Sequence, residues 1–192
     1  MTTLDTLVER NRDFASHDFS KDVSMMPSLG TMIIGCVDPR VDPTHVLGLD
    51  PGEAIVIRNV GGRVTPGTLQ TMGMLGKIAQ AEGANPREFH LIVLQHTQCG
   101  IVHLEGNPGM LASYFGIGQE GLSAKEVDSP HASVAVDVAA LKANPALPGN
   151  WLVSGLLYDV ATGLVEVVVP PTPLHHPGRL AQAAQGVMKD RQ

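Results

Sequence analysis

The sequence is poor in aromatic and in basic residues. Phenylalanine, tyrosine and tryptophan make up 4% of the 192 residues while 43% are hydrophobic, so the core is expected to consist mainly of aliphatic side chains. Lysine and arginine together number 13 against 19 acidic residues, a formal net charge of −6 at pH 7. Nucleic-acid-binding domains usually present a basic face, so this composition argues against a nucleic-acid partner.

The chain also lacks any apolar run of the roughly 20 residues needed to cross a bilayer. Residues 1–10 have the pattern of an amphipathic helix, not of a secretory leader with a basic stretch before an apolar one. We therefore expect a cytoplasmic protein with no membrane partner. The length favours one domain over 1–192, with a helical arm over 1–20 and a connection followed by a helix over 170–192.

Five short apolar runs alternate with helical patterns along the chain. This alternation predicts an α/β fold: a mainly parallel central sheet with flanking helices and a C-terminal antiparallel hairpin. The hairpin is expected because Asp159 and Gly163, both turn-forming residues, separate the last two runs. The five predicted strands cover residues 31–35, 54–57, 89–94, 151–157 and 165–169.

Two helix starts are marked by a capping residue followed by proline, a common pair at the first positions of helices. Thr65-Pro66 is expected to open a helix that closes near Gly83, and Ser129-Pro130 one that ends before Asn144. Terminal helices are predicted over residues 3–15 and 179–189, and the proline-rich segment 170–177 is expected to be an extended connection.

Cysteine is almost absent, and its two occurrences fall in short motifs rich in polar residues. Cys36 begins a Cys-Val-Asp-Pro-Arg motif, and Cys99 closes a His-Thr-Gln-Cys motif that begins with His96. Two cysteines in a chain without a leader favour free thiols or metal ligands over a disulfide. Two thiolates and an imidazole suit Zn²⁺, and a set of three protein ligands leaves a fourth position open, as in catalytic zinc sites.

The predicted strands bring these two motifs together. Cys36 and His96 each follow the carboxyl end of a predicted strand, which is where ligands bind in open α/β sheets. Asp38 and Arg40 lie two and four residues beyond Cys36. A pair of this kind is often only a surface ion pair of little energetic value, but here it lies beside a predicted metal ligand. We therefore interpret Asp38 and Arg40 as a catalytic pair.

Taken together, the motifs resemble those of the β-class carbonic anhydrases. The resemblance implies a zinc enzyme on a mainly parallel sheet, assembled as a homodimer or a dimer-based oligomer. It also implies reversible hydration of CO₂ to bicarbonate and a proton through zinc-bound hydroxide. The matching segments are Cys36-x-Asp38-x-Arg40, Arg58-Asn59-Val60-Gly61-Gly62, His96-x-x-Cys99-Gly100 and residues 155–163.

The resemblance assigns roles to individual residues. Asp38 either accepts a hydrogen bond from the zinc-bound solvent or ligates zinc itself, and Arg40 keeps it off the metal; we expect the first, open arrangement. Arg58 and Asn59 are expected to brace the loop and the dimer contact and not to touch the substrate. The expected zinc ligands are Cys36, His96 and Cys99. The glycines expected to let the backbone approach the pocket closely are Gly61, Gly62 and Gly100, whereas Val60 is expected to narrow that pocket.

The sequence departs from the family pattern in three places. Pro39 stands where serine is more frequent, and proline biases Asp38 toward extended backbone. Val60 replaces the usual alanine and is expected to narrow the pocket. Plant-type members of the family carry a glutamine upstream of the first cysteine, but residues 15–35 contain no glutamine. This absence favours resemblance to the smaller bacterial and archaeal branch.

Two other functions remain open at this stage. Hydrolases of carbonyl sulfide or carbon disulfide resemble the same motifs, and the ligand set does not discriminate between these substrates and CO₂. A non-catalytic zinc or bicarbonate-sensing protein is the other alternative, although a purely structural site needs neither Asp38 nor Arg40. His103 is the one further histidine near the second motif, and a proton-relay role for it stays open.

Overall fold

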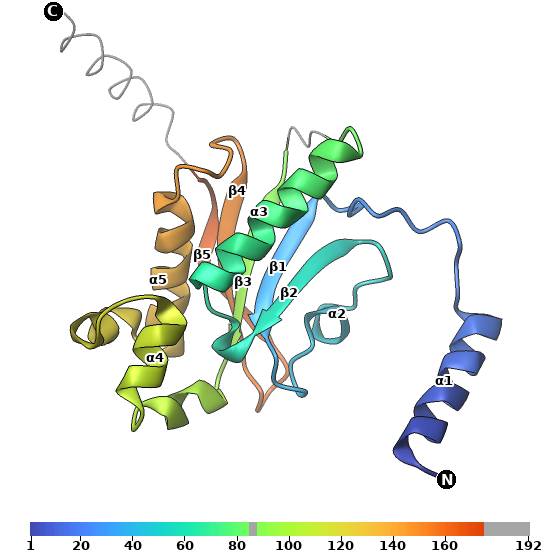
Figure 1. The fold of residues 1–192 in the computed structure, drawn as a ribbon, viewed down its shortest axis with the longest axis horizontal. Coiled ribbons are helices and arrows are strands. Elements are labelled where there is room, and N and C mark those ends of the chain that lie inside the picture. Colours follow the sequence, from blue (N-terminus) through green and yellow to red (C-terminus); the bar gives the residue numbers. More distant parts are fainter. Residues whose placement is uncertain (85–87, 175–192) are drawn as a thin grey trace, which may run out of the picture.

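The computed structural model describes residues 1–84 and 88–174, which form a five-stranded sheet with helices around it (Figure 1). The strand order is β2-β1-β3-β4-β5; the first four strands are parallel and β5 is antiparallel to β4. The predicted α/β class and the C-terminal hairpin are thus confirmed. The strands are β1 Thr31–Cys36, β2 Ala54–Asn59, β3 His90–His96, β4 Leu152–Tyr158 and β5 Val165–Pro173.

The two helices predicted from their start signals are present. In α3 the Thr65 side chain accepts a hydrogen bond from the Thr68 amide, and Pro130 occupies the first turn of α5. The helices are α1 Thr3–His17, α2 Pro43–Val46, α3 Pro66–Ala81, α4 Pro108–Phe115 and α5 Pro130–Ala143, with short 3₁₀ segments η1 Val60–Gly62, η2 Gly100–Leu104 and η3 Gln119–Lys125. Within the described ranges, no helix is both long and apolar enough to cross a membrane.

The main core lies between one face of the sheet and the helices α3 and α5 (Figure 1). Alternate residues of neighbouring parallel strands point to the same face, so their apolar side chains form one continuous layer. The buried members of this layer are Met32, Ile34, Leu91, Val93 and Val153 from the sheet, Met72 from α3, and Val138 and Leu141 from α5. This layer fixes the strands whose carboxyl ends carry the two cysteine and histidine motifs.

Helix α1 stands apart from the sheet (Figure 1), and none of its residues is buried. It is a well-formed helix, because the Thr2 hydroxyl and the Asp5 carboxylate each accept a hydrogen bond from the other's backbone amide. Its apolar side chains nevertheless face solvent, with Leu4 69% and Leu7 54% exposed. The helix was predicted as an N-terminal arm, and it buries none of its residues against the described part of this chain.

The C-terminal hairpin extends further than the sequence predicted. Strand β5 runs to Pro173, whereas the proline-rich segment from residue 170 was interpreted as a connection outside the sheet. Val153 pairs with Thr172 and Leu152 with Pro173 across an irregularity in the ladder. Proline is tolerated here because β5 is an edge strand. The helix predicted over 179–189 lies outside the described residues.

Candidate metal centre

The three proposed metal ligands converge at the carboxyl ends of β1 and β3. These strands are parallel neighbours, with Gly35 opposite Leu94, so the residues that follow are brought together. The ligand atoms of Cys36, His96 and Cys99 all lie within 4.8 Å of one another. The two sulfurs are 3.8 Å apart, far beyond the roughly 2.05 Å of a disulfide, and both cysteines are free. The sequence prediction that the two motifs meet is therefore confirmed.

The contact between the two thiols shifts their pKa values in opposite directions. The contact with Cys99 is the main cause that lowers the pKa of Cys36 to about 4, with a smaller contribution from His96. The same contact, together with burial, raises the pKa of the Cys99 thiol. The backbone amide of Asp38 donates to the Cys36 sulfur at 3.4 Å. Metal ligation requires thiolates, and the lowered pKa of Cys36 makes its thiolate available at neutral pH.

His96 is oriented so that one ring nitrogen remains available. Its Nδ1 lies 2.9 Å from the Thr97 carbonyl oxygen, to which it donates in the neutral ring form with the proton on Nδ1. Its Nε2 is buried and has no hydrogen-bond partner among the described residues. A buried lone pair beside two thiols fits a tetrahedral zinc ion with an open fourth position. The donor set of this chain thus fits Zn²⁺.

Asp38 lies beside the three ligands but is held by Arg40. Arg40 Nε and Nη2 donate to the two Asp38 carboxylate oxygens at 3.0 and 2.7 Å, and the Arg40 backbone amide donates at 2.9 Å. The Arg40 hydrogen bond is the main cause that lowers the pKa of Asp38 to about 2. Asp38 Oδ2 remains 3.9 Å from His96 Nε2. The carboxylate is therefore ionised at neutral pH and positioned next to the space between the ligands.

The loop that carries Cys36 and Asp38 is fixed by Arg58. Its guanidinium donates to the carbonyl oxygens of Cys36 and Asp38, both at 2.8 Å, and to the Asp42 carboxylate at 2.6 Å. One side chain of β2 thus fixes the backbone on both sides of residue 37. Arg58 contacts the loop and not the space between the ligands, as expected for a bracing residue.

The glycines of the site differ in why glycine is needed. Gly61 and Gly62 both adopt positive φ, 79° and 63°, and a Cβ on Gly62 would lie 3.0 Å from the Cys36 amide nitrogen and from the Leu94 carbonyl oxygen. Glycine at position 62 therefore permits close packing of backbone against the first metal ligand. A Cβ on Gly100 would meet no atom within 4 Å, so close packing does not require glycine there.

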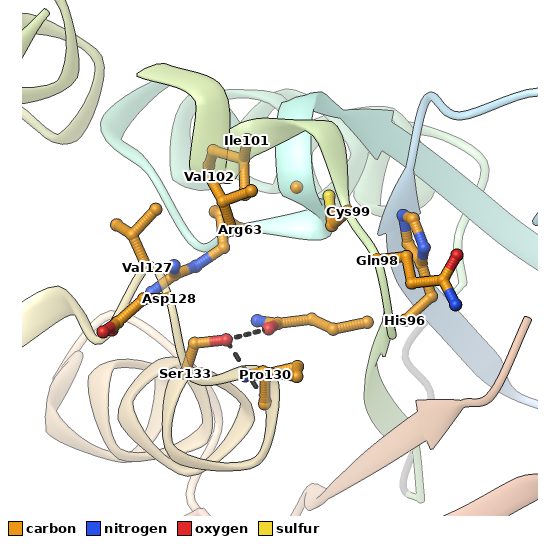
Figure 2. Close-up of a pocket in the computed structure, with 12 residues that line it drawn as sticks. Arg63, His96, Gln98, Cys99, Ile101, Val102, Val127, Asp128, Pro130 and Ser133 are labelled. Carbon is orange, nitrogen blue, oxygen red and sulfur yellow. Dashed lines mark hydrogen bonds between the residues drawn. The ribbon is translucent and has the colours of Figure 1, made fainter. Parts of the chain in front are cut away.

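A cavity of about 180 Å³ adjoins the ligands His96 and Cys99 (Figure 2). Of the residues that the sequence assigned to the pocket, only Gly61 lines this cavity, and Val60, Gly62 and Gly100 do not. The Val60 side chain is 42% exposed, while its carbonyl oxygen accepts a hydrogen bond from the Tyr114 hydroxyl at 2.7 Å. The cavity walls also include Arg63, Gln95, Gln98, Ile101, Val102, Val127, Asp128, Pro130 and Ser133.

Several residues that line the cavity belong to a buried polar network that the sequence analysis did not predict. Arg63 Nε and Gln95 Nε2 both donate to Asp137 Oδ2, at 2.6 and 2.8 Å, and the Ser133 hydroxyl donates to Gln95 Oε1. Burial raises the pKa of Asp137, although the Arg63 guanidinium opposes that shift. Gln95 directly precedes His96, so the network holds the end of β3 against α5. Two signals were present: a glutamine within an apolar strand, and an aspartate on the apolar side of a helix.

Comparison with known proteins places this geometry in a family. A family model described as carbonic anhydrase matches residues 31–165. The β-carbonic anhydrase 1 of Mycobacterium tuberculosis is 29% identical over 176 residues, which covers 88% of this chain and all of that protein. A carbon disulfide hydrolase of Saccharolobus solfataricus is 24% identical over 159 residues, covering 68% of this chain and 72% of that protein.

Solved structures agree with the sequence comparison. The crystal structure of a carbonic anhydrase from Streptococcus mutans superposes with a TM-score of 0.66 at 26% identity, and covers 88% of this chain and 98% of that chain. The family model spans well over half of the sequence, including both motifs that supply the candidate ligands. The chain belongs to the β-carbonic anhydrase family of enzymes.

Proposed function

We propose that the protein catalyses the reversible hydration of CO₂ to bicarbonate and a proton, with one Zn²⁺ held by Cys36, His96 and Cys99. The observation that carries the proposal is the convergence of these three ligand atoms within 4.8 Å of one another, with the unpartnered Nε2 of His96 beside the two thiols. Three protein ligands leave a fourth position for solvent, which a purely structural zinc site does not. Family membership supports the same reaction.

The chain's own residues have distinct tasks in this reaction. A zinc ion at the three ligands supplies a Lewis acid that lowers the pKa of water from about 15.7 toward neutrality. Asp38 accepts a hydrogen bond from the reacting water and so directs an oxygen lone pair toward the carbon of CO₂. Arg40 keeps the Asp38 carboxylate in this position through two charge-assisted hydrogen bonds. One C–O bond forms, and the proton of the water leaves to solvent.

Turnover of CO₂ by the zinc-loaded protein tests the proposal. We expect stopped-flow measurements to give kcat/KM above about 10⁴ M⁻¹s⁻¹, the lower end for efficient enzymes, and metal-free protein to be inactive. Carbonyl sulfide and carbon disulfide are offered in parallel, with hydrogen sulfide release as the readout. Sulfide release without CO₂ hydration would transfer the function to those substrates, and no turnover of any of the three would favour a non-catalytic role.

Carbon disulfide hydrolysis is the second candidate, because the carbon disulfide hydrolase of Saccharolobus solfataricus matches 68% of the chain. The sulfur substrates are attacked at carbon by the same kind of solvent nucleophile, so the three ligands and Asp38 suit both reactions. CO₂ hydration remains the first choice, because a relative that matches 88% of this chain over its own whole length is named a β-carbonic anhydrase. The parallel assay above separates the two.

We also propose that the protein is a homodimer or a dimer-based oligomer, in which α1 docks on a second copy of the chain. Leu4, Leu7 and Val8 lie on one side of α1 and are exposed, although such side chains normally pack against another surface. Sedimentation velocity is expected to show at least a dimer. Leu7→Asp should shift it toward monomer, whereas Thr6→Asp, on the opposite side of the helix, should leave it assembled. A monomeric wild-type protein with full activity would contradict the docking role of α1.

The proposed compartment is the cytoplasm. Both cysteines of the chain are free thiols, and both are needed as thiolates for the proposed metal site. A reducing compartment keeps such thiols available, whereas an oxidising one promotes disulfides.

A further inference from the structure

The turn between β4 and β5 belongs to the segment 155–163 that resembles the family pattern, yet the proposed reaction gives this turn no task. Strand β4 is the parallel neighbour of β3, and its Tyr158 lies opposite the metal ligand His96. The turn therefore leaves β4 at the same edge of the sheet at which β3 ends in His96 (Figure 1). A residue of the turn can thus act on His96 through the loop that follows β3.

Thr97 joins His96 to this turn with all of its polar atoms. Its carbonyl oxygen lies 2.9 Å from His96 Nδ1 and accepts the ring proton of that nitrogen. Its backbone amide donates to the Tyr158 carbonyl oxygen at 3.0 Å. Its hydroxyl donates to Asp159 Oδ1 and accepts from the Val160 amide, both at 3.1 Å. Three of these four contacts reach the turn, so the turn fixes the residue whose carbonyl group His96 meets.

The Asp159 carboxylate, which receives the Thr97 hydroxyl, is itself fixed by the turn. Its Oδ1 also accepts from the Ala161 amide at 2.9 Å, and its Oδ2 accepts from the Thr162 hydroxyl at 3.1 Å. The Gly163 amide closes the turn on the Asp159 carbonyl oxygen at 2.8 Å. The Ala161 amide is the main cause that lowers the pKa of Asp159, with smaller contributions from the two hydroxyls. The acceptor is therefore a charged carboxylate at neutral pH, which strengthens its hydrogen bonds.

The Thr97 carbonyl group decides which ring nitrogen of His96 faces the other ligands. With Nδ1 held by this carbonyl, the lone pair is on Nε2, the buried atom beside Cys36 and Cys99 that has no partner among the described residues. The next residue, Gln98, has a φ of 54°, a left-handed conformation that is uncommon for residues other than glycine. Local backbone preference therefore does not hold the peptide group between residues 97 and 98, and contacts from elsewhere must do so.

We propose that Asp159 is a positioning residue for the metal centre, which acts through the Thr97 hydroxyl to keep His96 Nε2 facing the two cysteines. Metal-binding histidines commonly donate their other ring N–H to a carbonyl or carboxylate group, and loss of that partner lowers metal affinity or activity about 10- to 100-fold. In this chain the carbonyl belongs to the residue after the ligand, and the carboxylate of the hairpin fixes that residue. The inference rests on the proposed zinc site and adds to it a contact from the β4–β5 turn.

Thr97→Val tests the proposal, because valine keeps the shape of the side chain but removes the hydroxyl. Zinc affinity is measured on the zinc-loaded full chain by competition with a chelator. It is expected to fall about tenfold, the lower end of the range for such partners, since the backbone contact with Tyr158 remains. Thr97→Ser keeps the hydroxyl and loses only the methyl group, so it should retain wild-type affinity. An equal loss in the serine and valine variants would assign the effect to packing and overturn the proposal.

Thr162→Val is the matched control. Thr162 donates to the other oxygen of the same carboxylate, so this change weakens the turn without removing the contact between Asp159 and Thr97. Zinc affinity should stay unchanged in this variant. The NMR signal of the His96 Nδ1–H proton gives a second readout: exchange with water should be faster than wild type in Thr97→Val and unchanged in Thr162→Val. A turn that only stabilises the fold would give the same result in both valine variants, and that outcome overturns the proposal.

Combining Thr97→Val with Asp159→Ala locates the effect. Both changes remove the same hydrogen bond, so the double variant should bind zinc no more weakly than the weaker-binding single variant. Additive losses would show that Asp159 acts by another route, against the proposal. A wild-type chain that binds no zinc would overturn the proposed function together with this inference. Equal affinities in Thr97→Val and Thr162→Val, with zinc bound by wild type, would overturn the inference alone.

Discussion

Replacing Cys99 with serine is expected to strip the protein of zinc and to abolish CO₂ hydration. The wild-type chain should carry about one zinc ion, since its described residues hold a single set of three ligands. Serine keeps the size of the side chain but replaces a soft thiolate with a poor ligand, and only Cys36 and His96 then remain. Loss of a partner that merely orients a metal ligand costs about 10- to 100-fold in affinity or activity, so loss of a ligand should exceed this.

Elemental analysis of the purified variant gives the zinc content directly. His103→Gln serves as the control, because His103 is exposed in the 3₁₀ segment that follows Cys99 and lies outside the ligand group. This control should retain both zinc and turnover, and a selective loss of turnover in it would instead revive the proton-relay role for His103. Full zinc occupancy in Cys99→Ser would remove Cys99 from the ligand set.

The positions of the metal ligands could be predicted because they depend on local sequence patterns. Strand ends were visible as apolar runs that stop at Cys36 and His96, and a parallel sheet aligns such ends at one edge. The starts of α3 and α5 followed from local patterns as well, since Thr65 and Ser129 each precede a proline at the first helical position. The fold and the ligand set therefore rested on features within a few residues of each other.

The buried network beside the ligands could not be predicted in the same way. The Arg63–Asp137 pair joins residues 74 positions apart, and its geometry depends on how α5 packs against β3. Arg63 follows the Gly61-Gly62 turn, and an arginine there would ordinarily be assigned to the surface on composition alone. The polar interruption at Gln95 and the aspartate among the apolar residues of α5 indicated buried hydrogen bonds, but not their partners.

Edge strand β5 and the short helices show a second limit of sequence reasoning. Strand β5 includes three prolines at its end, and proline normally argues against a strand; its position at the sheet edge, which is a tertiary property, removes the conflict. Helices α2 and α4 have 4 and 8 residues, too few for a 3.6-residue periodicity to stand out. Neither error affected the site, because the ligand-bearing strand ends lie elsewhere.

Replacing Arg40 with alanine is expected to close the metal site while the zinc content stays normal. Arg40 contributes three hydrogen bonds to the Asp38 carboxylate, and its Nη2 also donates to the Gln98 carbonyl oxygen at 3.1 Å, which fixes the guanidinium between the two motifs. Alanine retains the backbone donor but removes the side-chain restraint. An ionised carboxylate whose Oδ2 lies 3.9 Å from His96 Nε2 then has a short path to the open coordination position. Hydration should fall by at least about 100-fold, the upper range for groups that orient metal ligands.

Zinc-edge X-ray absorption distinguishes this closure from loss of metal or loss of fold. Arg40→Ala should show the scattering of a coordinated carboxylate, which the double variant with Asp38→Ala lacks because no carboxylate remains to fill the position. Arg40→Lys is the graded control: it keeps a positive charge beside Asp38 but cannot make the two-pronged contact, so partial closure is expected. Wild-type turnover and an unchanged zinc environment in Arg40→Ala would reduce the Asp38–Arg40 pair to a surface ion pair. Closure with retained zinc would instead establish that Arg40 acts on the metal through Asp38, as the hydrogen-bond geometry indicates.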